Sequence, residues 1–438
     1  MDLLISFALF MAAMICCLLS GVSMALALAL GLAAFLLCAR RRGFALKDSA
    51  RMCLRGMQES LVVALVMLLI GCLTSLWRQS GTIAYFTYYG VKLIPPQIFV
   101  LAAFLLASLM SYALGTSFGV AGTIGVILMT IARASGVSPA LVGGAIMSGL
   151  YFGDRGSPVA SSAVLVANET RTEVSRNFKR MMPASILPMA LCALLYALLS
   201  IFARPDAVDS ALLSEFEMEF SLSPWCLLPT ALMLALAFAG MPIRRVMLID
   251  IVASFALTML VQGGAFFDVL RMMFAGYAPR RAALAPVLSG GGVASMLEIV
   301  LLLFLSSGCA GVFEGTRMLG SVERAFTSLC RRIGRFPAMA VASVLSCAVF
   351  CNQTIGIIMC RQCMAPNYPD SDAGREALML DIENSVVVIA GLVPWCIACS
   401  VPIGMLGCGL GALPFSAYLY LLPLCWHIKL RLRGRAAA

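Results

Sequence analysis

Apolar runs long enough to cross a membrane recur along the whole chain. Segments 3–19, 22–38, 61–77 and 181–202 approach or fit the span of about 17–25 residues that a bilayer requires. Hydrophobic residues make up 61 % of the 438 residues, charged residues 12 %, and the mean hydropathy is +0.98. Because a soluble domain is roughly 45–50 % apolar and about 25 % charged, this chain lacks the polar surface that water requires. The sequence therefore predicts an all-α integral membrane protein.

The charged residues gather between the apolar runs. The chain has 31 basic and 21 acidic residues, a net charge of +10. Basic clusters between spans are typical of cytoplasmic loops, so we expect no nucleic-acid partner and place the clusters 40–55, 171–180, 324–335 and 429–435 in the cytoplasm. The acid-rich stretch 206–219 should lie outside. The first apolar run has Asp2 and no basic residue, so we expect a retained helix rather than a signal peptide. This predicts a multi-pass protein of the cell membrane with both termini cytoplasmic.

Cysteine and histidine usage argues against a bound metal or catalytic centre. His427 is the sole histidine, and nearly all of the seventeen cysteines lie inside apolar runs, where cysteine packs as a small apolar residue. We expect no disulfide, no cofactor and no enzymatic activity. Two CxxC spacings, Cys360–Cys363 and Cys396–Cys399, keep a cysteine-based membrane redox protein as a remote alternative.

Four apolar segments are interrupted by small and polar residues. If basic loops lie in the cytoplasm, segment 97–134 must begin and end outside, so we expect it to form a re-entrant hairpin with its break at 115–119. Segment 139–168, broken at 153–158, then crosses the membrane. Segments 337–364, broken at 351–354, and 376–411, broken at 391–395, repeat this pattern. The sequence predicts about ten transmembrane helices plus two re-entrant hairpins in two inverted-topology repeats, 1–203 and 224–438, joined by an outside linker, 204–223. Three arginines do not fit this arrangement because they fall outside: Arg271, Arg280 and Arg281.

The paired breaks predict a substrate cavity, because irregular backbone at membrane depth persists only where protein or water surrounds it. Asp154 and Glu383 lie inside broken spans, where a charge costs about 2.5–3.5 kcal/mol, and we expect them to bind the coupling proton or cation. The cavity should be lined by Gly115, Thr116, Ser117, Arg155, Ser157, Ser161, Ser162, Asn352, Gln353, Thr354, Asn384, Ser385, Pro394 and Trp395. Each feature also has a structural interpretation. The breaks could be helix kinks that serve packing, Asp154 could form a local ion pair with Arg155, and Glu383 could lie at a helix end near the cytoplasmic surface.

The break segments resemble the signatures of the NhaC-type sodium/proton antiporters. The resemblance rests on GTSFGVAGTIGV at 115–126, YFGDRGSP at 151–158, CNQT at 351–354, and ENS at 383–385 followed by Pro394-Trp395. It implies an ion-transporter-superfamily fold and exchange of a cation such as Na⁺, or of a small organic acid in some relatives, against protons by alternating access.

The chain departs from that family pattern at two acidic positions. Ser161, Ser162 and Ala163 stand where the pattern has an acid and two threonines, and Asn384 stands where it has a second acid. Since Na⁺ prefers oxygen ligands with a balancing carboxylate, the alternative is a transporter of a small organic anion or amino acid on the same fold. Arg155 and half-helix N-termini would then hold a carboxylate. Protons, lipid and either Na⁺ or a small organic solute are the expected partners, and a homodimer remains open.

Overall fold

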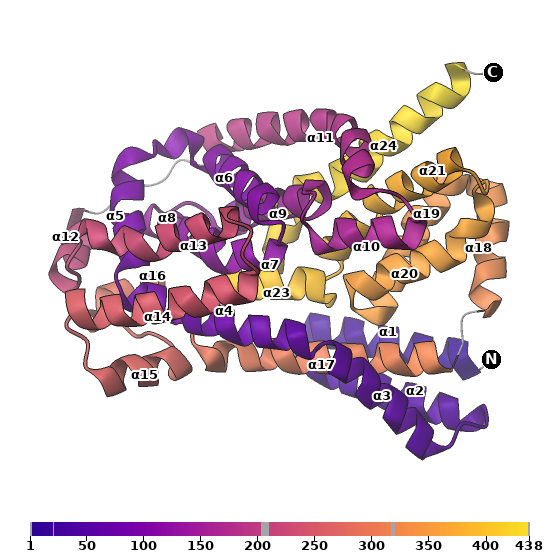
Figure 1. Ribbon diagram of the computed structural model, residues 1–438, viewed down its shortest axis with the longest axis horizontal. Helices are drawn as coiled ribbons and strands as arrows, with labels where there is room; N and C mark the ends of the chain where they lie inside the picture. Colours follow the sequence, from indigo (N-terminus) through magenta and orange to yellow (C-terminus); the bar gives the residue numbers. More distant parts are fainter. Residues whose placement is uncertain (1, 21, 203–209, 317–319, 437–438) are drawn as a thin grey trace.

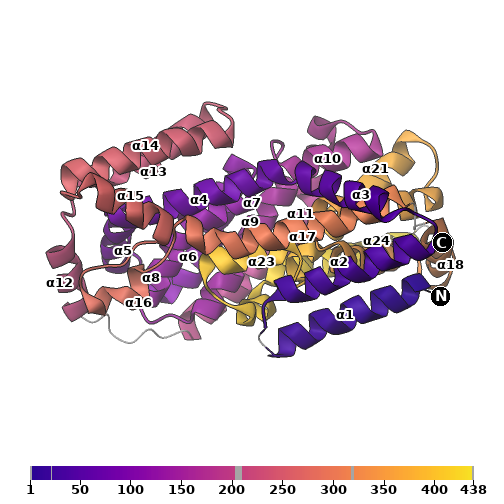
Figure 2. The same ribbon diagram turned by 90° about the horizontal axis from the view of Figure 1, so that it is seen from below.

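The protein is helical nearly throughout. The computed structural model describes residues 2–20, 22–202, 210–316 and 320–436. Over these ranges no β-strand forms, and one isolated bridge joins Tyr277 to Gly290. Most helices run along the long axis of the molecule, and α1 and α24 place the two ends of the chain at the same end of it (Figures 1 and 2). The predicted all-α class is confirmed.

The first half of the chain folds into helices α1 to α11. A π-helical turn at Ala121–Gly125 joins α7 to α8, so that 117–134 is one continuous helical segment. The bounds are α1 (Asp2–Ser20), α2 (Met24–Arg41), α3 (Leu46–Glu59), α4 (Leu61–Gln79), α5 (Thr82–Leu93), α6 (Phe99–Leu114), α7 (Ser117–Val120), α8 (Val126–Ala134), α9 (Pro139–Gly156), α10 (Ser161–Thr170) and α11 (Val174–Phe202).

The second half folds into helices α12 to α24, with short 3-10 turns between several of them. The bounds are α12 (Ser210–Glu219), α13 (Leu228–Phe238), α14 (Ile243–Val261), α15 (Phe266–Ala275), α16 (Ala285–Leu288), α17 (Val293–Gly315), α18 (Gly320–Ile333), α19 (Arg335–Phe350), α20 (Gln353–Met364), α21 (Asp372–Glu383), α22 (Val386–Ile389), α23 (Ile397–Leu406) and α24 (Ala417–Ala436). The last helix, α24, begins at Ala417, after a 3-10 turn at Leu410–Phe415.

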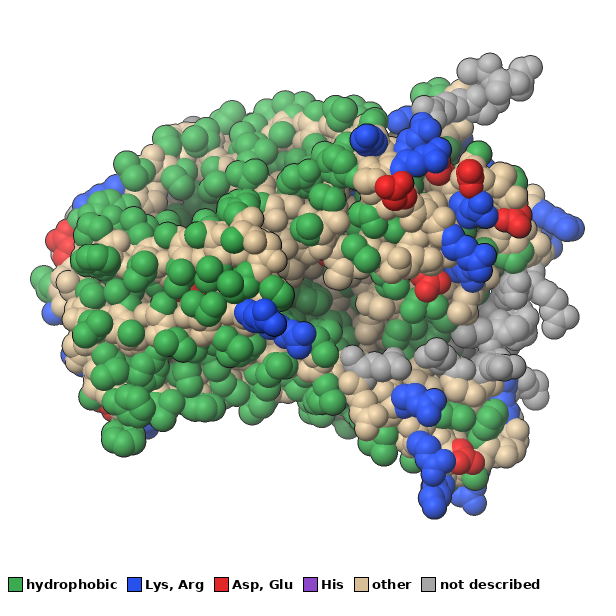
Figure 3. All heavy atoms as spheres, viewed as in Figure 1, with side chains coloured by type: hydrophobic (Ala, Val, Ile, Leu, Met, Phe, Trp, Pro, Cys, Tyr) green, Lys and Arg blue, Asp and Glu red, His purple; other side chains and the backbone are tan. Residues whose placement is uncertain are grey.

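Several helices have the length and composition to cross a membrane. Within the described ranges five qualify, namely α2, α4, the segment 117–134, α11 and α17, or up to seven when two bent helix pairs are each counted as one span. Apolar side chains cover most of the surface in Figure 3, and charged side chains gather mainly at the end where α10, α18 and α21 lie. The chain is a multi-pass membrane protein.

Two of the four breaks lie slightly further along the chain than the sequence predicted, whereas those at 115–116 and 351–352 begin where predicted and are shorter. We expected irregular backbone from Gly153, but α9 stays helical through Gly156, so Asp154 and Arg155 occupy its last turns. The helix ends where Pro158 disfavours the helical conformation of the residue before it. The irregular segment is therefore 157–160. In the second half the helix unwinds at 384–385 and again at 393–396, the latter stretch containing Pro394.

The two halves share the backbone geometry of their breaks. Between α6 and α7, Gly115 has φ +63° and Thr116 is extended; between α19 and α20, Cys351 has φ +54° and Asn352 is extended. The extended residue in each case caps the next helix: Thr116 Oγ1 accepts from the Gly119 N–H (3.3 Å) and Asn352 Oδ1 from the Thr354 N–H (2.9 Å). Each break therefore ends one helix and starts the next within two residues.

Two of the three arginines that did not fit the charge rule, Arg280 and Arg281, contact acidic residues. Arg281 pairs with Glu215 at 3.0 Å, and the Arg280 N–H donates to Glu219 Oε1 at 2.8 Å. The acid-rich segment after α11 thus lies against Arg280 and Arg281, and Glu215 offsets the charge of Arg281. Asp206 and Asp209, which belong to the same predicted outside segment, fall outside the described residues.

Glycines on α9 allow it to pack directly on the backbone of α6. A Cβ atom added at Gly149 would lie 2.7 Å from the Ser108 nitrogen, and one added at Gly153 would lie 2.1 Å from the Ser111 carbonyl carbon. Small residues four apart are the usual means by which membrane helices approach closely. This contact fixes the helix that carries Asp154 and Arg155.

We expect Gly153→Ala to destabilise the protein strongly. Overpacking costs about 1–3 kcal/mol, and the obstacle here is backbone, which cannot rotate away. The measurement is the thermal unfolding midpoint in detergent. Gly156→Ala is the matched control, because its Cβ would meet only the Met182 sulfur at 3.9 Å. Equal midpoints for the two variants would contradict the close α6–α9 contact.

Candidate functional site

Gln353 connects the broken helices of the two halves. It is the first residue of α20, and its Nε2 donates to Asp154 Oδ2 (3.0 Å) and to the Val387 carbonyl oxygen (2.8 Å). Asp154 is 4 % exposed, and its own carbonyl oxygen accepts from the Ser162 hydroxyl at 2.5 Å. The structure therefore brings together residues from α9, α10, α20 and α22 that lie up to about 230 positions apart in the chain.

Arg155 is buried and bonded to protein groups. Its guanidinium donates to Asn384 Oδ1 (2.6 Å), to the Met181 carbonyl oxygen (3.3 Å) and to the Ser185 hydroxyl, which also accepts from Tyr418 (3.3 Å). Its Nε has no partner. No Asp154–Arg155 ion pair within 4.0 Å occurs in the described structure, although the two residues are adjacent. Arg155 thus joins α9 to α11 and to the unwound segment after α21.

Glu383 is a fully buried carboxylate without a hydrogen-bond partner. It is the last residue of α21, is 0 % exposed, and neither Oε1 nor Oε2 has a donor. It therefore lies at a helix end but does not reach the surface. The charges that act on it are those of Arg155 and Asp154. With both acids ionised, these three groups carry a net charge of −1, which one proton or one monovalent cation would balance. A buried charge requires such compensation.

A cavity of about 700 Å³ lies beside this cluster, between α3 and α17 on one side and α7, α20 and α23 on the other. A recess between these elements is visible in Figure 3. Its polar lining is Ser60, Ser307, Asn352, Gln353, Thr354 and Gln362. Its apolar lining includes Phe118, Leu303, Phe313, Phe350, Ile355, Ile358 and Met359.

Three of the predicted lining residues, Asn352, Gln353 and Thr354, face this cavity. The other predicted residues do not line it: Gly115, Thr116, Ser117, Arg155, Ser157, Ser161, Ser162, Asn384, Ser385, Pro394 and Trp395. Several of these bond to backbone instead; for example, Trp395 donates to the Ala348 carbonyl oxygen at 2.7 Å. Sequence reasoning missed Ser60, Ser307, Ser185 and Tyr418. Ser60 lies at the junction of α3 and α4, and the other three lie on helices that carry no interruption signal.

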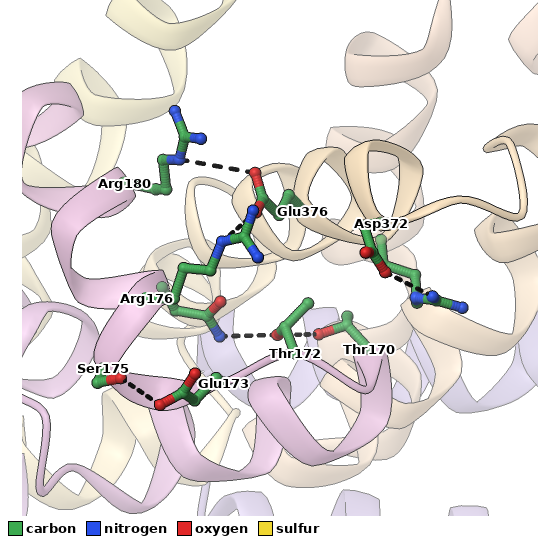
Figure 4. A network of polar contacts seen from close by, with 10 residues as sticks. Thr170, Thr172, Glu173, Ser175, Arg176, Arg180, Asp372 and Glu376 are labelled. Carbon is green, nitrogen blue, oxygen red and sulfur yellow. Dashed lines mark hydrogen bonds and ion pairs between the residues drawn. The ribbon is translucent and has the colours of Figure 1, made fainter.

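A surface network ties the helix of Glu383 to the α10–α11 connection. Arg176 and Arg180 pair with Glu376 of α21 at 2.7 and 3.6 Å, and Thr172 bonds Thr170 and Asn177 (Figure 4). The arginine side chains are more than half exposed, and such pairs each contribute only about 0–1 kcal/mol. These pairs connect α21 to the start of α11.

Buried carboxylates and a cavity at broken helices of a membrane-embedded chain are the features of a secondary transporter. Sequence comparison assigns the family. A sequence model of the Na⁺/H⁺ antiporter family matches residues 3–167 and 149–428. The chain belongs to the Na⁺/H⁺ antiporter family.

Relatives that are named for different activities align with most of the chain. The Malate-2H⁺/Na⁺-lactate antiporter of Bacillus subtilis is 26 % identical over 81 % of this chain and 77 % of its own length. The Na⁺/H⁺ antiporter NhaC of the same organism is 25 % identical over 87 % of this chain and 86 % of its own. The Arginine/ornithine antiporter ArcD of Halobacterium salinarum is 23 % identical over 78 % and 73 %. The predicted resemblance to NhaC is confirmed, and the protein is a secondary antiporter.

Proposed function

We propose that this protein exchanges a cation or small solute against protons, with Asp154 and Glu383 as the groups that bind the coupling proton or cation. The observation that carries the proposal is Glu383, whose two oxygens are buried without a donor. A proton or a monovalent cation would supply the missing positive charge. Gln353 faces the cavity and also bonds Asp154, so a solute that moves Gln353 changes the environment of that carboxylate.

The arrangement of helices around the cavity supports an alternating-access mechanism. One wall consists of α3 and α17, and the other consists of the tips of α7, α20 and α23. A rocking or sliding motion of these two walls would close the present opening and expose the tips to the opposite side. The matching breaks at Gly115–Thr116 and Cys351–Asn352 support two inverted repeats, as expected for this mechanism.

We further propose the finer topology of about ten spans plus two re-entrant hairpins, α6–α8 and α19–α20, in repeats 1–203 and 224–438. The two hairpins lie toward opposite ends of the molecule in Figure 1, as inverted repeats require. The end that holds the charged network of α21 would be cytoplasmic, with both chain termini there, in the cell membrane. The linker 204–223 would lie at the opposite end.

Cysteine labelling tests this topology. In a background without native cysteines, Ser175→Cys and Ser328→Cys should react only with reagent supplied from the cytoplasmic side, and Ser221→Cys only from outside. All three positions are exposed. Membrane-impermeant maleimide applied to intact cells and to inverted vesicles gives the readout. Reaction of all three from the same side would overturn the inverted repeats.

The second candidate is transport of a small organic anion or amino acid on the same fold. Two observations favour it: a 700 Å³ cavity far exceeds the size of a bare cation, and none of the described side chains that line the cavity is acidic. Two relatives are named for exchange of organic acids or of arginine and ornithine.

Reconstitution separates the two candidates. Proteoliposomes that contain a pH-sensitive dye are exposed to Na⁺, K⁺, Li⁺, small carboxylates and amino acids in turn. A proton flux that starts on addition of one of these identifies the exchanged species. Absence of any proton flux with all of them, from folded protein in sealed vesicles, would refute the proposed function.

A further inference from the structure

None of the described side chains on the walls of the 700 Å³ cavity is charged. The polar groups on them are three hydroxyls (Ser60, Thr354 and Ser307) and three amides (Asn352, Gln353 and Gln362), and most of the remaining surface is aliphatic or aromatic. A ligand with a second carboxylate would find no lysine, arginine or histidine there, and one with an ammonium group would find no carboxylate. Asp154 does not line the cavity, and its Oδ2 accepts a hydrogen bond from Gln353.

One end of the cavity is nevertheless electropositive. α20 is a 12-residue helix whose first residues, Gln353 to Ile355, line the cavity. Asn352 caps only the Thr354 N–H, so among the described residues the N–H groups of Gln353 and Ile355 lack an acceptor. A helix N-terminus acts as about half a positive charge.

A second, independent group faces the same cavity. Ser307 of α17 is 4 % exposed, lines the cavity, and its hydroxyl has no hydrogen-bond partner. A buried serine in a helix ordinarily bonds to the carbonyl four residues earlier, as Ser343 of α19 does at 2.8 Å. An unmatched buried hydroxyl and a free helix N-terminus thus line the same cavity, and one anionic ligand would satisfy both.

We propose that the cavity binds a small monocarboxylate with an apolar body. The carboxylate accepts from the free N–H groups of α20 and from Ser307, and the body contacts the apolar wall that includes Leu303, Phe350 and Ile358. Because the walls hold no further charge, dicarboxylates and amino acids are rejected. The inference names the solute of the proposed antiporter and so rests on that function.

Four solutes with four-carbon chains test this charge requirement. Binding of radiolabelled butyrate to the purified full-length protein is measured by equilibrium dialysis, with succinate, 4-aminobutyrate and butyramide as competitors. We expect butyrate to bind at least about tenfold more tightly than each competitor, since a charge-assisted hydrogen bond is roughly twice as strong as a neutral one and unpaired buried charges are costly. Equal competition by butyramide, or tighter binding of succinate or 4-aminobutyrate, would overturn the proposal.

Ser307→Ala tests the residue. It should weaken butyrate binding about tenfold and leave the thermal unfolding midpoint of the ligand-free protein unchanged, because the hydroxyl has no partner to lose. Ser295→Ala on the same helix is the control, since Ser295 lies outside the cavity lining and bonds the Gly292 carbonyl oxygen. Unchanged butyrate affinity in Ser307→Ala would refute the site.

The two proposals fail in different ways. Na⁺-driven proton flux without butyrate binding would refute the monocarboxylate site and keep the antiporter function. Butyrate binding with the expected preference but without any coupled proton flux would keep the site and refute the proton-coupled function.

Discussion

Asp154→Asn is expected to reduce proton-coupled transport to the background of empty vesicles while the protein still folds. Asparagine keeps an oxygen that can accept the bond from Gln353, so the contact between α9 and α20 survives. The substitution removes the ionisable group on which coupling is proposed to depend, and it also removes the cost of a charge at membrane depth. Dye-reported proton flux in proteoliposomes gives the transport readout, and the unfolding midpoint verifies the fold.

Two further variants decide between coupling and a structural role for Asp154. Asp250→Asn is the matched control, because Asp250 is also buried and accepts hydrogen bonds from Trp77 (3.1 Å) and Ser254 (3.5 Å). Asp250 lies on α14 and is not part of the cavity lining, so transport should persist in this variant. Arg155→Gln combined with Asp154→Asn tests pairing between these neighbours. Recovery of proton-coupled transport in that double variant would rule out Asp154 as the coupling group.

Glu383→Gln is expected to abolish coupled transport without lowering stability. Glutamine has nearly the same shape, and since neither carboxylate oxygen accepts a hydrogen bond, the substitution breaks none. It removes the group whose charge a proton or cation must balance. Transport is measured as for Asp154, and the unfolding midpoint in detergent should stay equal to or rise above that of the unsubstituted protein.

Asp381→Asn on the same helix should give the opposite result. The Asp381 carboxylate accepts from Tyr368 (2.6 Å) and from Trp426 (2.7 Å), so an amide nitrogen in place of one oxygen faces a donor. We expect a loss of about 1–3 kcal/mol of stability, with transport by the folded fraction retained. If Glu383→Gln lost stability as Asp381→Asn does and still transported, the assigned role of Glu383 would be wrong.

The positions of the helix breaks could be predicted only in part from the sequence. Small and polar residues marked all four interruptions, but Gly153, Asp154 and Arg155 were expected in irregular backbone and remain helical. Glycine in a helix interior costs only about 1 kcal/mol, which close packing against α6 offsets. Pro158 disfavours the helical conformation more strongly than these glycines do, and α9 ends at Gly156, two residues before it.

The lining of the cavity was less predictable still. Polar residues at a break point either into a cavity or toward neighbouring backbone, and sequence spacing does not distinguish the two. Asn352 and Gln353 line the cavity, whereas Ser162 and Trp395 satisfy carbonyl oxygens. Ser307 lies in an unbroken apolar span, and its significance depends on the absence of a partner, which only coordinates reveal.

The sequence by itself determined the membrane class and the family, because hydropathy and signature motifs are local properties of the chain. It also singled out Asp154 and Glu383 as charges at membrane depth, and their role in coupling stays a prediction. Only the tertiary structure decided which groups meet. Asp154 bonds Gln353 rather than the adjacent Arg155, Arg155 bonds Asn384 from the other half, and Glu383 is left without a donor. These pairings depend on how the two halves pack in three dimensions, and adjacency in the sequence does not encode them.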